Sequence, residues 1–183
     1  MKSKWIEFVK SVLDSIGLSY VWNSQMSLES MDIKTFVKQI MVDHFIQKWH
    51  SEIENSSRGE FYGIFKNNFG IEKYLLRLKK SQRVYITRFR CCNVKFAIEI
   101  GRWNNIPKEE RFCNLCNDRC IGDYFHYLFV CSNPNVAELG NRYLHNYYYV
   151  YLSIDKMCRL LSLCNVKVLN NLALYIKKVT KYL

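Results

Sequence analysis

Proline and glycine are scarce in this chain, at two and seven residues among 183. Charged residues make up only 23% of the sequence, and no internal repeat is present. This composition excludes a collagen-like protein and does not fit an intrinsically disordered one. Because 49% of the residues are hydrophobic and 15% are aromatic, the chain can build a sizeable core. We expect one globular domain or two small ones.

Long apolar runs are also absent. No window approaches the roughly 18 consecutive apolar residues that a membrane span needs. Residues 1–17 mix Lys, Glu and Asp with apolar side chains, which is unlike a secretion signal. We therefore expect an intracellular protein, nuclear or cytoplasmic, with no membrane partner. In a reducing compartment its eight cysteines favour metal ligation over disulfides.

Catalytic motifs are lacking as well. The sequence has no Asp-Asp or Asp-x-Asp pair that could hold two polymerase metal ions. It also has no Gly-rich phosphate loop, no G-x-S-x-G elbow and no H-E-x-x-H helix. We expect no enzymatic activity of its own.

Positive charge is abundant and concentrated in one segment. The net charge is +11, and residues 73–111 contribute eleven basic and three acidic side chains, whereas residues 1–72 carry a net charge of −1. A short charge run usually marks a solvated helical face, but this run is long and interleaved with aromatic residues. Such a segment is typical of a surface that follows phosphates and stacks on bases. The residues predicted to contact RNA or DNA are Lys79, Lys80, Arg83, Arg88, Arg90, Arg102, Lys108 and Arg111.

Helical spacing refines this prediction. Arg83 and Arg90, together with Lys79, can share one face of a helix. Arg88 points in another direction, and we expect it to form an internal ion pair. Exposed Tyr85 or Trp103 would supply any base selectivity, because an aromatic ring can stack on an unpaired base.

Apolar periodicity is helical almost throughout. Between residues 5 and 16 the apolar side chains recur every three or four positions, and Gly17 stands where a C-terminal cap is expected. A second helix is predicted from Asp32, as its N-cap, to about Ile53. No Asn-Gly or Asp-Gly dipeptide indicates a β-hairpin. Further helices are predicted over about 60–68, 71–79, 82–91 (with Ser81 as a cap) and 94–100, and a last amphipathic helix over 169–183.

These patterns predict an all-α fold, a small helical domain with a CCHC zinc knuckle inserted between helices. We divide the chain into an N-terminal helical part (1–72), a basic helical segment (73–111), the zinc knuckle (112–134) and C-terminal helices (135–183). All four are expected to form one compact unit.

The knuckle is predicted from the spacing C-x2-C-x9-H-x4-C, formed by Cys113, Cys116, His126 and Cys131. Three thiolates and an imidazole without an open position favour a single structural Zn²⁺ ion over a catalytic one. Cys120 is an alternative to His126, but His126 is preferred because Cys131 follows it at a ligand-like spacing. The remaining cysteines, which have no partner at short spacing, are interpreted as small apolar core residues: Cys91, Cys92, Cys158 and Cys164.

Four stretches together are similar to a known family: "FIQKWHSEIENSSRGEFYGIF", "ITRFRCCNVKFAIEIGRW", "IPKEERFCNLC" and "DYFHYLFVC". From about Trp5 to beyond Cys131, the chain resembles the C-terminal segment of reverse transcriptases from non-LTR (LINE-type) retrotransposons. The resemblance implies a helical region that lies after the polymerase core and helps hold element RNA or target DNA during target-primed reverse transcription. It also implies that the four knuckle residues are the family's metal ligands, and that a reverse transcriptase core is a possible partner in trans.

Two functions remain open at this point. The first is a non-catalytic, zinc-containing nucleic-acid-binding domain. The second is a zinc-stapled helical protein-interaction module, in which amphipathic helices bind a partner and the positive charge only aids solubility or steering.

Overall fold

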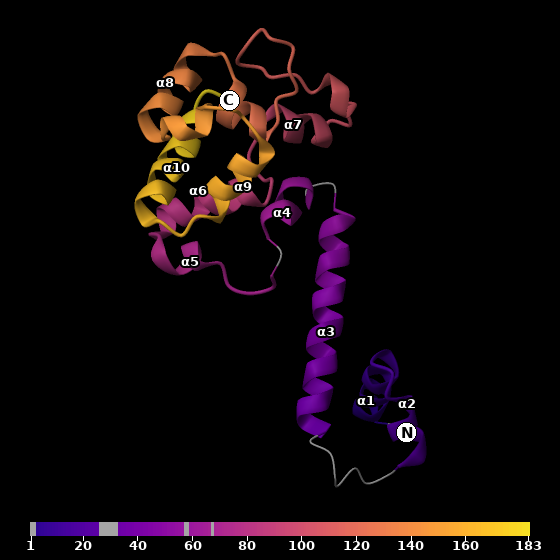
Figure 1. Cartoon of the computed structure of the whole chain (residues 1–183). Helices are drawn as coiled ribbons and strands as arrows, with labels where there is room; N and C mark the ends of the chain where they lie inside the picture. The colour runs from indigo at the N-terminus through magenta and orange to yellow at the C-terminus, as the bar shows by residue number, and fades with distance from the viewer. Residues whose placement is uncertain (1–2, 26–32, 57–58, 67) are drawn as a thin grey trace. The chain divides into compact units, whose positions relative to one another are not determined.

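The computed structural model describes residues 3–25, 33–56, 59–66 and 68–183. Over these residues the regular structure is helical (Figure 1), with one isolated antiparallel bridge between Phe112 and Ile121. The predicted all-α fold is confirmed. Each helix within the described ranges is too short or too polar to cross a lipid bilayer. The elements are α1 (Lys4–Ser15), α2 (Ser19–Ser24), α3 (Ile33–Glu54), α4 (Gly59–Phe65), α5 (Lys73–Arg77), α6 (Lys80–Arg90), α7 (Ala97–Trp103), η1 (Lys108–Glu110), η2 (His126–Val130), α8 (Pro134–Tyr143), η3 (Asn146–Tyr149), α9 (Ile154–Ser162) and α10 (Val166–Val179).

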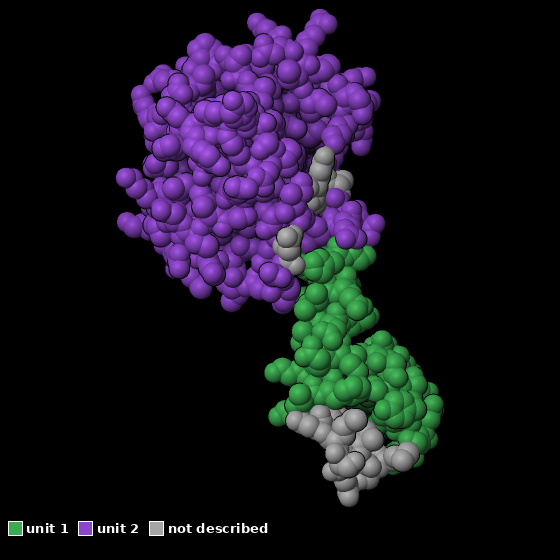
Figure 2. Space-filling view, in the orientation of Figure 1, with its two compact units in different colours: residues 1–52 green, residues 53–183 purple. Residues whose placement is uncertain are grey.

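The chain divides into two compact units (Figure 2). Unit 1 comprises residues 1–52 and unit 2 comprises residues 53–183. This division differs from the predicted single unit with an internal boundary at residue 72. The basic segment, the knuckle and the C-terminal helices all belong to unit 2.

Unit 1 contains the two helices predicted near the N-terminus. α1 ends as expected, because Gly17 adopts a φ of +74° and the backbone N–H of Leu18 donates to the Leu13 carbonyl at 2.8 Å. α3 matches the second predicted helix, although its proposed cap, Asp32, lies outside the described residues. Leu18 is the one buried residue among those described in unit 1.

α10 is the central helix of unit 2 and packs against α6 and α8 (Figure 1). Asn165 caps its N-terminus by accepting hydrogen bonds from the backbone N–H groups of Lys167 and Val168. The predicted apolar stripe is buried as far as α10 extends, and each large aliphatic side chain removed from water contributes about 1.5 to 3 kcal/mol. Its members within α10, all at most 1% exposed, are Leu169, Leu172, Ile176 and Val179. Leu183, the last residue of the predicted stripe, lies beyond α10 and is half-buried.

An aromatic cluster joins α6 to the segment around η2. The rings of Phe96 and Tyr127 stack with centroids 4.3 Å apart, and the Tyr124 ring meets Phe96 and Phe89 edge-on at 5.0 and 5.1 Å. The Tyr124 hydroxyl accepts a hydrogen bond from the backbone N–H of Val94 at 3.1 Å. Because such ring pairs stabilise beyond the area they bury, the cluster fixes η2 against the helical core.

Several helix boundaries differ from the sequence predictions. α6 begins at Lys80, with Lys79 at its N-cap position, so Ser81 lies inside the helix and the prediction that it caps the helix is wrong. α8 and α9, for which the sequence predicts only unspecified C-terminal helices, each begin after a residue type that commonly caps helices. Asn133 caps α8 and Ser153 caps α9, each through its side-chain oxygen.

Candidate metal centre

The first pair of cysteines lies on a tight turn closed by an antiparallel bridge. The backbone N–H of Cys113 donates to the Cys120 carbonyl at 2.9 Å, and the N–H of Gly122 donates to the Arg111 carbonyl at 2.9 Å. These two hydrogen bonds hold residues 113–120 as a loop on which Cys113 and Cys116 face inward. The sequence offered no β-hairpin signal here, because a single bridge needs no alternating apolar strands.

The second pair of ligand residues lies at the two ends of a π-helical turn, η2. Asp123 precedes this turn and acts as an N-cap, because its carboxylate accepts a hydrogen bond from the backbone N–H of His126 at 2.7 Å. The turn then closes with the N–H of Cys131 donating to the His126 carbonyl at 2.8 Å. This i→i+5 bond carries the chain round so that His126 and Cys131, five residues apart, lie on the same side.

Two tyrosines satisfy the carbonyl groups of this turn. The Tyr175 hydroxyl, from α10, donates to the Tyr127 carbonyl, and the Tyr149 hydroxyl donates to the Leu128 carbonyl at 3.4 Å. Buried backbone carbonyls without a partner would destabilise the fold, so these bonds support an otherwise rare helical geometry.

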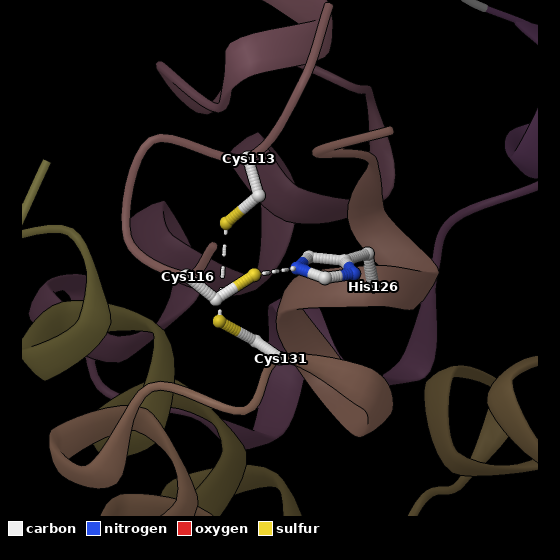
Figure 3. Close-up of side chains that lie close together, drawn as sticks. All are labelled: Cys113, Cys116, His126 and Cys131. Carbon is white, nitrogen blue, oxygen red and sulfur yellow. Dashed lines mark hydrogen bonds between the residues drawn. The ribbon is translucent and has the colours of Figure 1, made fainter. Parts of the chain in front are cut away.

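The four predicted ligand residues converge on one point (Figure 3). The sulfur atoms of Cys113 and Cys131 lie 3.9 Å apart, and the Cys116 sulfur lies 3.4 Å from Nε2 of His126. All four ligand atoms lie within 4.8 Å of one another, and three of the four residues are buried. The quartet Cys113, Cys116, His126 and Cys131 could therefore bind one metal ion. Cys120, the alternative ligand, is exposed outside this group.

Burial and hydrogen bonds shift the pKa values of the cluster residues. Burial raises the pKa of the Cys131 thiol to about 12 and lowers the pKa of His126, which keeps its imidazole neutral and able to coordinate. Burial also raises the pKa of Cys113, but hydrogen bonds to its sulfur lower it by more, so the pKa of this thiol is lowered overall. One of these bonds comes from the backbone N–H of Leu115. Metal ligation requires deprotonated thiols, so a bound cation would offset the repulsion among three thiolates.

Neighbouring residues hold the cluster against the helices. Gly122 lies so close to α7 that a Cβ there would be 2.7 Å from the Cβ of Ala97, so the site needs glycine. Asn133 caps α8 and also donates from Nδ2 to the Leu115 carbonyl at 2.8 Å, which ties that helix to the Cys113–Cys116 turn. Sequence reasoning missed the caps Asp123 and Asn133, although the Asn-Pro step at residues 133–134 is a recognisable start signal.

Seven of the eight predicted nucleic-acid contacts fall into two groups. Lys79, Lys80, Arg88 and Lys108 are exposed. The other group is half-buried and bonded within the chain: Arg83 donates to the Leu75 carbonyl, Arg102 pairs with Glu99, and Arg111 donates to the Ile106 carbonyl.

Arg90 is not available for such contacts, and the prediction that it contacts phosphates is wrong. Its side chain is 3% exposed, pairs with Glu72 at 3.0 Å and donates to the Leu161 carbonyl at 2.6 Å. The rings of Phe65 and Tyr74 flank its guanidinium. The expected internal ion pair of α6 thus belongs to Arg90, while Arg88 faces solvent.

The other cysteines meet their predicted role in part. Cys92 and Cys158 are buried, as expected of small apolar core residues, and Cys164 is half-buried. Cys91, at the C-cap of α6, is exposed, so its prediction as a core residue is wrong.

Comparisons of the chain with protein-family models, with curated proteins and with solved structures found no match. The family resemblance therefore rests on the sequence motifs themselves.

Proposed function

We propose that this protein is a non-catalytic nucleic-acid-binding domain whose fold is stabilised by one zinc ion. The observation that carries the proposal is a set of exposed cations on α6 and in the segments that flank it. From residue 73 to residue 98 the sequence contains no Asp or Glu. Within that stretch Lys79, Lys80, Arg88 and Lys95 are exposed and make no hydrogen bond or ion pair through their side chains with any described residue. Cations without a protein partner are free to neutralise phosphates.

Zinc is the metal that best fits the donor set. Three sulfurs and one imidazole nitrogen suit Zn²⁺ in a closed tetrahedral site. With Zn–S of about 2.3 Å and Zn–N of about 2.0 Å, tetrahedral angles place two sulfurs about 3.8 Å apart and a sulfur and nitrogen about 3.5 Å apart. The Cys113–Cys131 sulfur separation of 3.9 Å and the Cys116–His126 separation of 3.4 Å agree with these values, and the other separations are at most 4.8 Å.

The resemblance to the C-terminal segment of LINE-type reverse transcriptases supports the same function. It leads us to propose element RNA or target DNA as the partner, with a reverse transcriptase core as a possible second partner. In this proposal the zinc ion is structural: it holds the knuckle on α7 and α8, and the basic residues of the same unit contact the phosphates.

A salt titration with a single-stranded oligonucleotide tests this function. Each phosphate contact adds about 0.7 to the magnitude of the slope of log affinity against log salt. The double variant Lys79→Ala/Lys80→Ala should therefore lower affinity and reduce the slope by about 1.4. The matched control is Arg142→Ala/Arg159→Ala, which removes the same charge from exposed ion pairs on α8 and α9 and should change the slope little. No binding at low salt would contradict the proposal.

A protein-interaction module is the second candidate, and unit 1 carries the observation that favours it. Its described residues expose Trp5, Phe8, Phe36 and Phe45 by 70, 65, 41 and 52%. Exposed aromatic side chains on helices are typical anchors for a protein partner. Substituting Trp5 and Phe8 by Ser would leave nucleic-acid affinity unchanged and abolish partner binding if this function holds.

A further inference from the structure

A pocket of about 380 Å³ lies among α6, α7 and α10, apart from the metal centre. Tyr85 and Arg88 come from α6, Trp103 comes from α7, and Lys95 lies on the turn that joins these helices. α10 contributes Ile176, and the segment after it contributes Thr180. The other lining residues are Asn93, Val94, Ile100 and Leu183.

The pocket combines three kinds of contact. Val94 and Ile176 are buried and provide an apolar floor, at 5 and 1% exposure. Trp103 is 45% exposed, so part of its ring is open to a bound molecule. Arg88 and Lys95 are exposed without a side-chain partner among the described residues, and no lining side chain carries a carboxylate.

This combination matches one nucleotide better than other ligands. A nucleotide has a flat ring system, which an aromatic side chain can stack on, and an anionic phosphate, which needs a nearby cation. Asn93 and Thr180 add hydrogen-bonding groups for the edge of a base or a sugar hydroxyl. A volume of about 380 Å³ is near the lower end of the about 300 to 1,000 Å³ typical of ligand pockets, so it holds a single unit and not a duplex.

A second pocket, of about 580 Å³, also has aromatic and basic residues, which include Tyr143, Tyr147, Arg142 and Lys167. Its Arg142 already pairs with Glu138 at 2.7 Å. The first pocket keeps both of its cations without such a partner, and it lies on the acid-free segment. It is therefore the better anion site.

We propose that the pocket among α6, α7 and α10 receives one unpaired nucleotide of a bound strand, with its base against Trp103 and Tyr85 and its phosphate at Arg88 and Lys95. The inference rests on the proposed nucleic-acid-binding function and adds a base-contacting subsite to it. It makes the domain prefer single strands or flipped-out bases over continuous duplex.

The test compares two single strands of about 12 nucleotides, an oligothymidine and an abasic strand of the same length. Both carry the same phosphates, and the abasic strand has no bases. Fluorescence anisotropy with the 183-residue chain at low salt should show about tenfold tighter binding of oligothymidine, as expected for stacking of one base. Trp103→Ala should remove most of this difference while the affinity for the abasic strand stays within about twofold.

Three further variants separate stacking from charge and from folding. Trp103→Tyr keeps an aromatic ring and should restore most of the preference for oligothymidine. Arg88→Ala should weaken binding of both strands and reduce the salt slope by about 0.7. Arg159→Ala removes the same charge outside the pocket and should change neither strand's affinity. Thermal unfolding of each variant checks that it is folded.

The outcomes distinguish the subsite from the general function. Equal wild-type affinity for the two strands, or a Trp103→Ala variant that weakens both in parallel, would overturn the subsite and leave the nucleic-acid-binding function standing. Failure to bind either strand at low salt would overturn both.

Discussion

Arg88 and Arg90, two positions apart on α6, have opposite environments. Arg90 is 3% exposed and pairs with Glu72, which also pairs with Lys66 at 2.8 Å. Arg88 faces solvent at the edge of the pocket. Arginine is therefore a buried, ion-paired residue at position 90 and an exposed residue at position 88.

Replacing each arginine by methionine should separate these roles. Arg90→Met leaves a partly buried carboxylate and should lower the free energy of unfolding by about 3 kcal/mol, because Lys66 compensates only in part. Arg88→Met should change stability by less than about 0.5 kcal/mol. Urea unfolding monitored by circular dichroism measures both. Equal stability of the two variants would contradict the buried ion pair.

Individual ligand residues provide the next prediction. Cys113→Ser, His126→Ala and Cys131→Ser should each lower the metal content of the purified protein well below one ion per chain. Cys120→Ser is the matched control, since this exposed cysteine lies on the same loop outside the cluster. Native mass spectrometry and elemental analysis give the stoichiometry. Loss of metal in the Cys120→Ser variant alone would show that the ligand set is wrong.

At the scale of helices, two asparagine caps differ in one respect. Asn133 and Asn165 cap α8 and α10 in the same way, each accepting from two backbone N–H groups. Asn133 alone of the two also bonds the Leu115 carbonyl, inside the Cys113–Cys116 turn. Asn133 therefore connects a helix end to the metal centre.

Substituting these caps by alanine should show this connection. Each variant should lose about 1 kcal/mol of stability, the usual cost of a missing N-cap. Asn133→Ala should in addition release metal faster to a chelator, whereas Asn165→Ala should release it at the wild-type rate. A chromophoric chelator follows the release. Equal rates would mean that the Asn133 bond does not support the turn.

At the scale of the whole molecule, the two units differ in how much they bury. The core consists almost entirely of unit 2 residues, whereas Leu18 alone is buried among those described in unit 1. A unit with so little buried surface has little to stabilise it in isolation.

A fragment of residues 53–183 should therefore fold cooperatively and bind one metal ion. Its thermal midpoint in the presence of zinc should lie within a few degrees of that of the full chain. A fragment of residues 1–52 should unfold without a cooperative transition. Circular dichroism melts with metal analysis test both fragments, and a metal-free or unfolded 53–183 fragment would contradict the division.

The buried tyrosines should make the stability of the fold sensitive to alkaline pH. Burial raises the pKa of Tyr149 to about 12 and also raises the pKa values of Tyr124 and Tyr175. In the unfolded chain a tyrosine ionises near its ordinary pKa of about 10, so above that pH the unfolded state binds fewer protons than the folded state. Stability should change less between pH 8 and 9 than above pH 10, where it should fall as pH rises. Urea midpoints measured from pH 8 to 11 test this, and Tyr149→Phe should weaken the dependence.

Local sequence patterns sufficed for part of this structure. The all-α fold, the Gly17 cap and the α10 stripe follow from helical spacing and cap residues, which act between neighbours in the chain. The metal quartet also followed from spacing, because ligands on short turns must recur at fixed intervals. Helix boundaries such as that of α6 were missed, because packing can shift a helix end by a few residues without changing its period.

Other features depend on residues that are far apart in the sequence. The π-helical turn that carries His126 depends on α10, because its Tyr127 carbonyl accepts a hydrogen bond from Tyr175, 48 positions away. The burial of Arg90 depends on Glu72 and on the carbonyl of Leu161, and the pocket needs α10 beside α6 and α7. The sequence by itself determined the helical class of the fold and the set of candidate metal ligands, because both follow from spacings between residues that are near one another in the chain. Only the tertiary structure decided which cations face solvent and where an aromatic pocket forms, because burial and proximity arise when distant segments pack together.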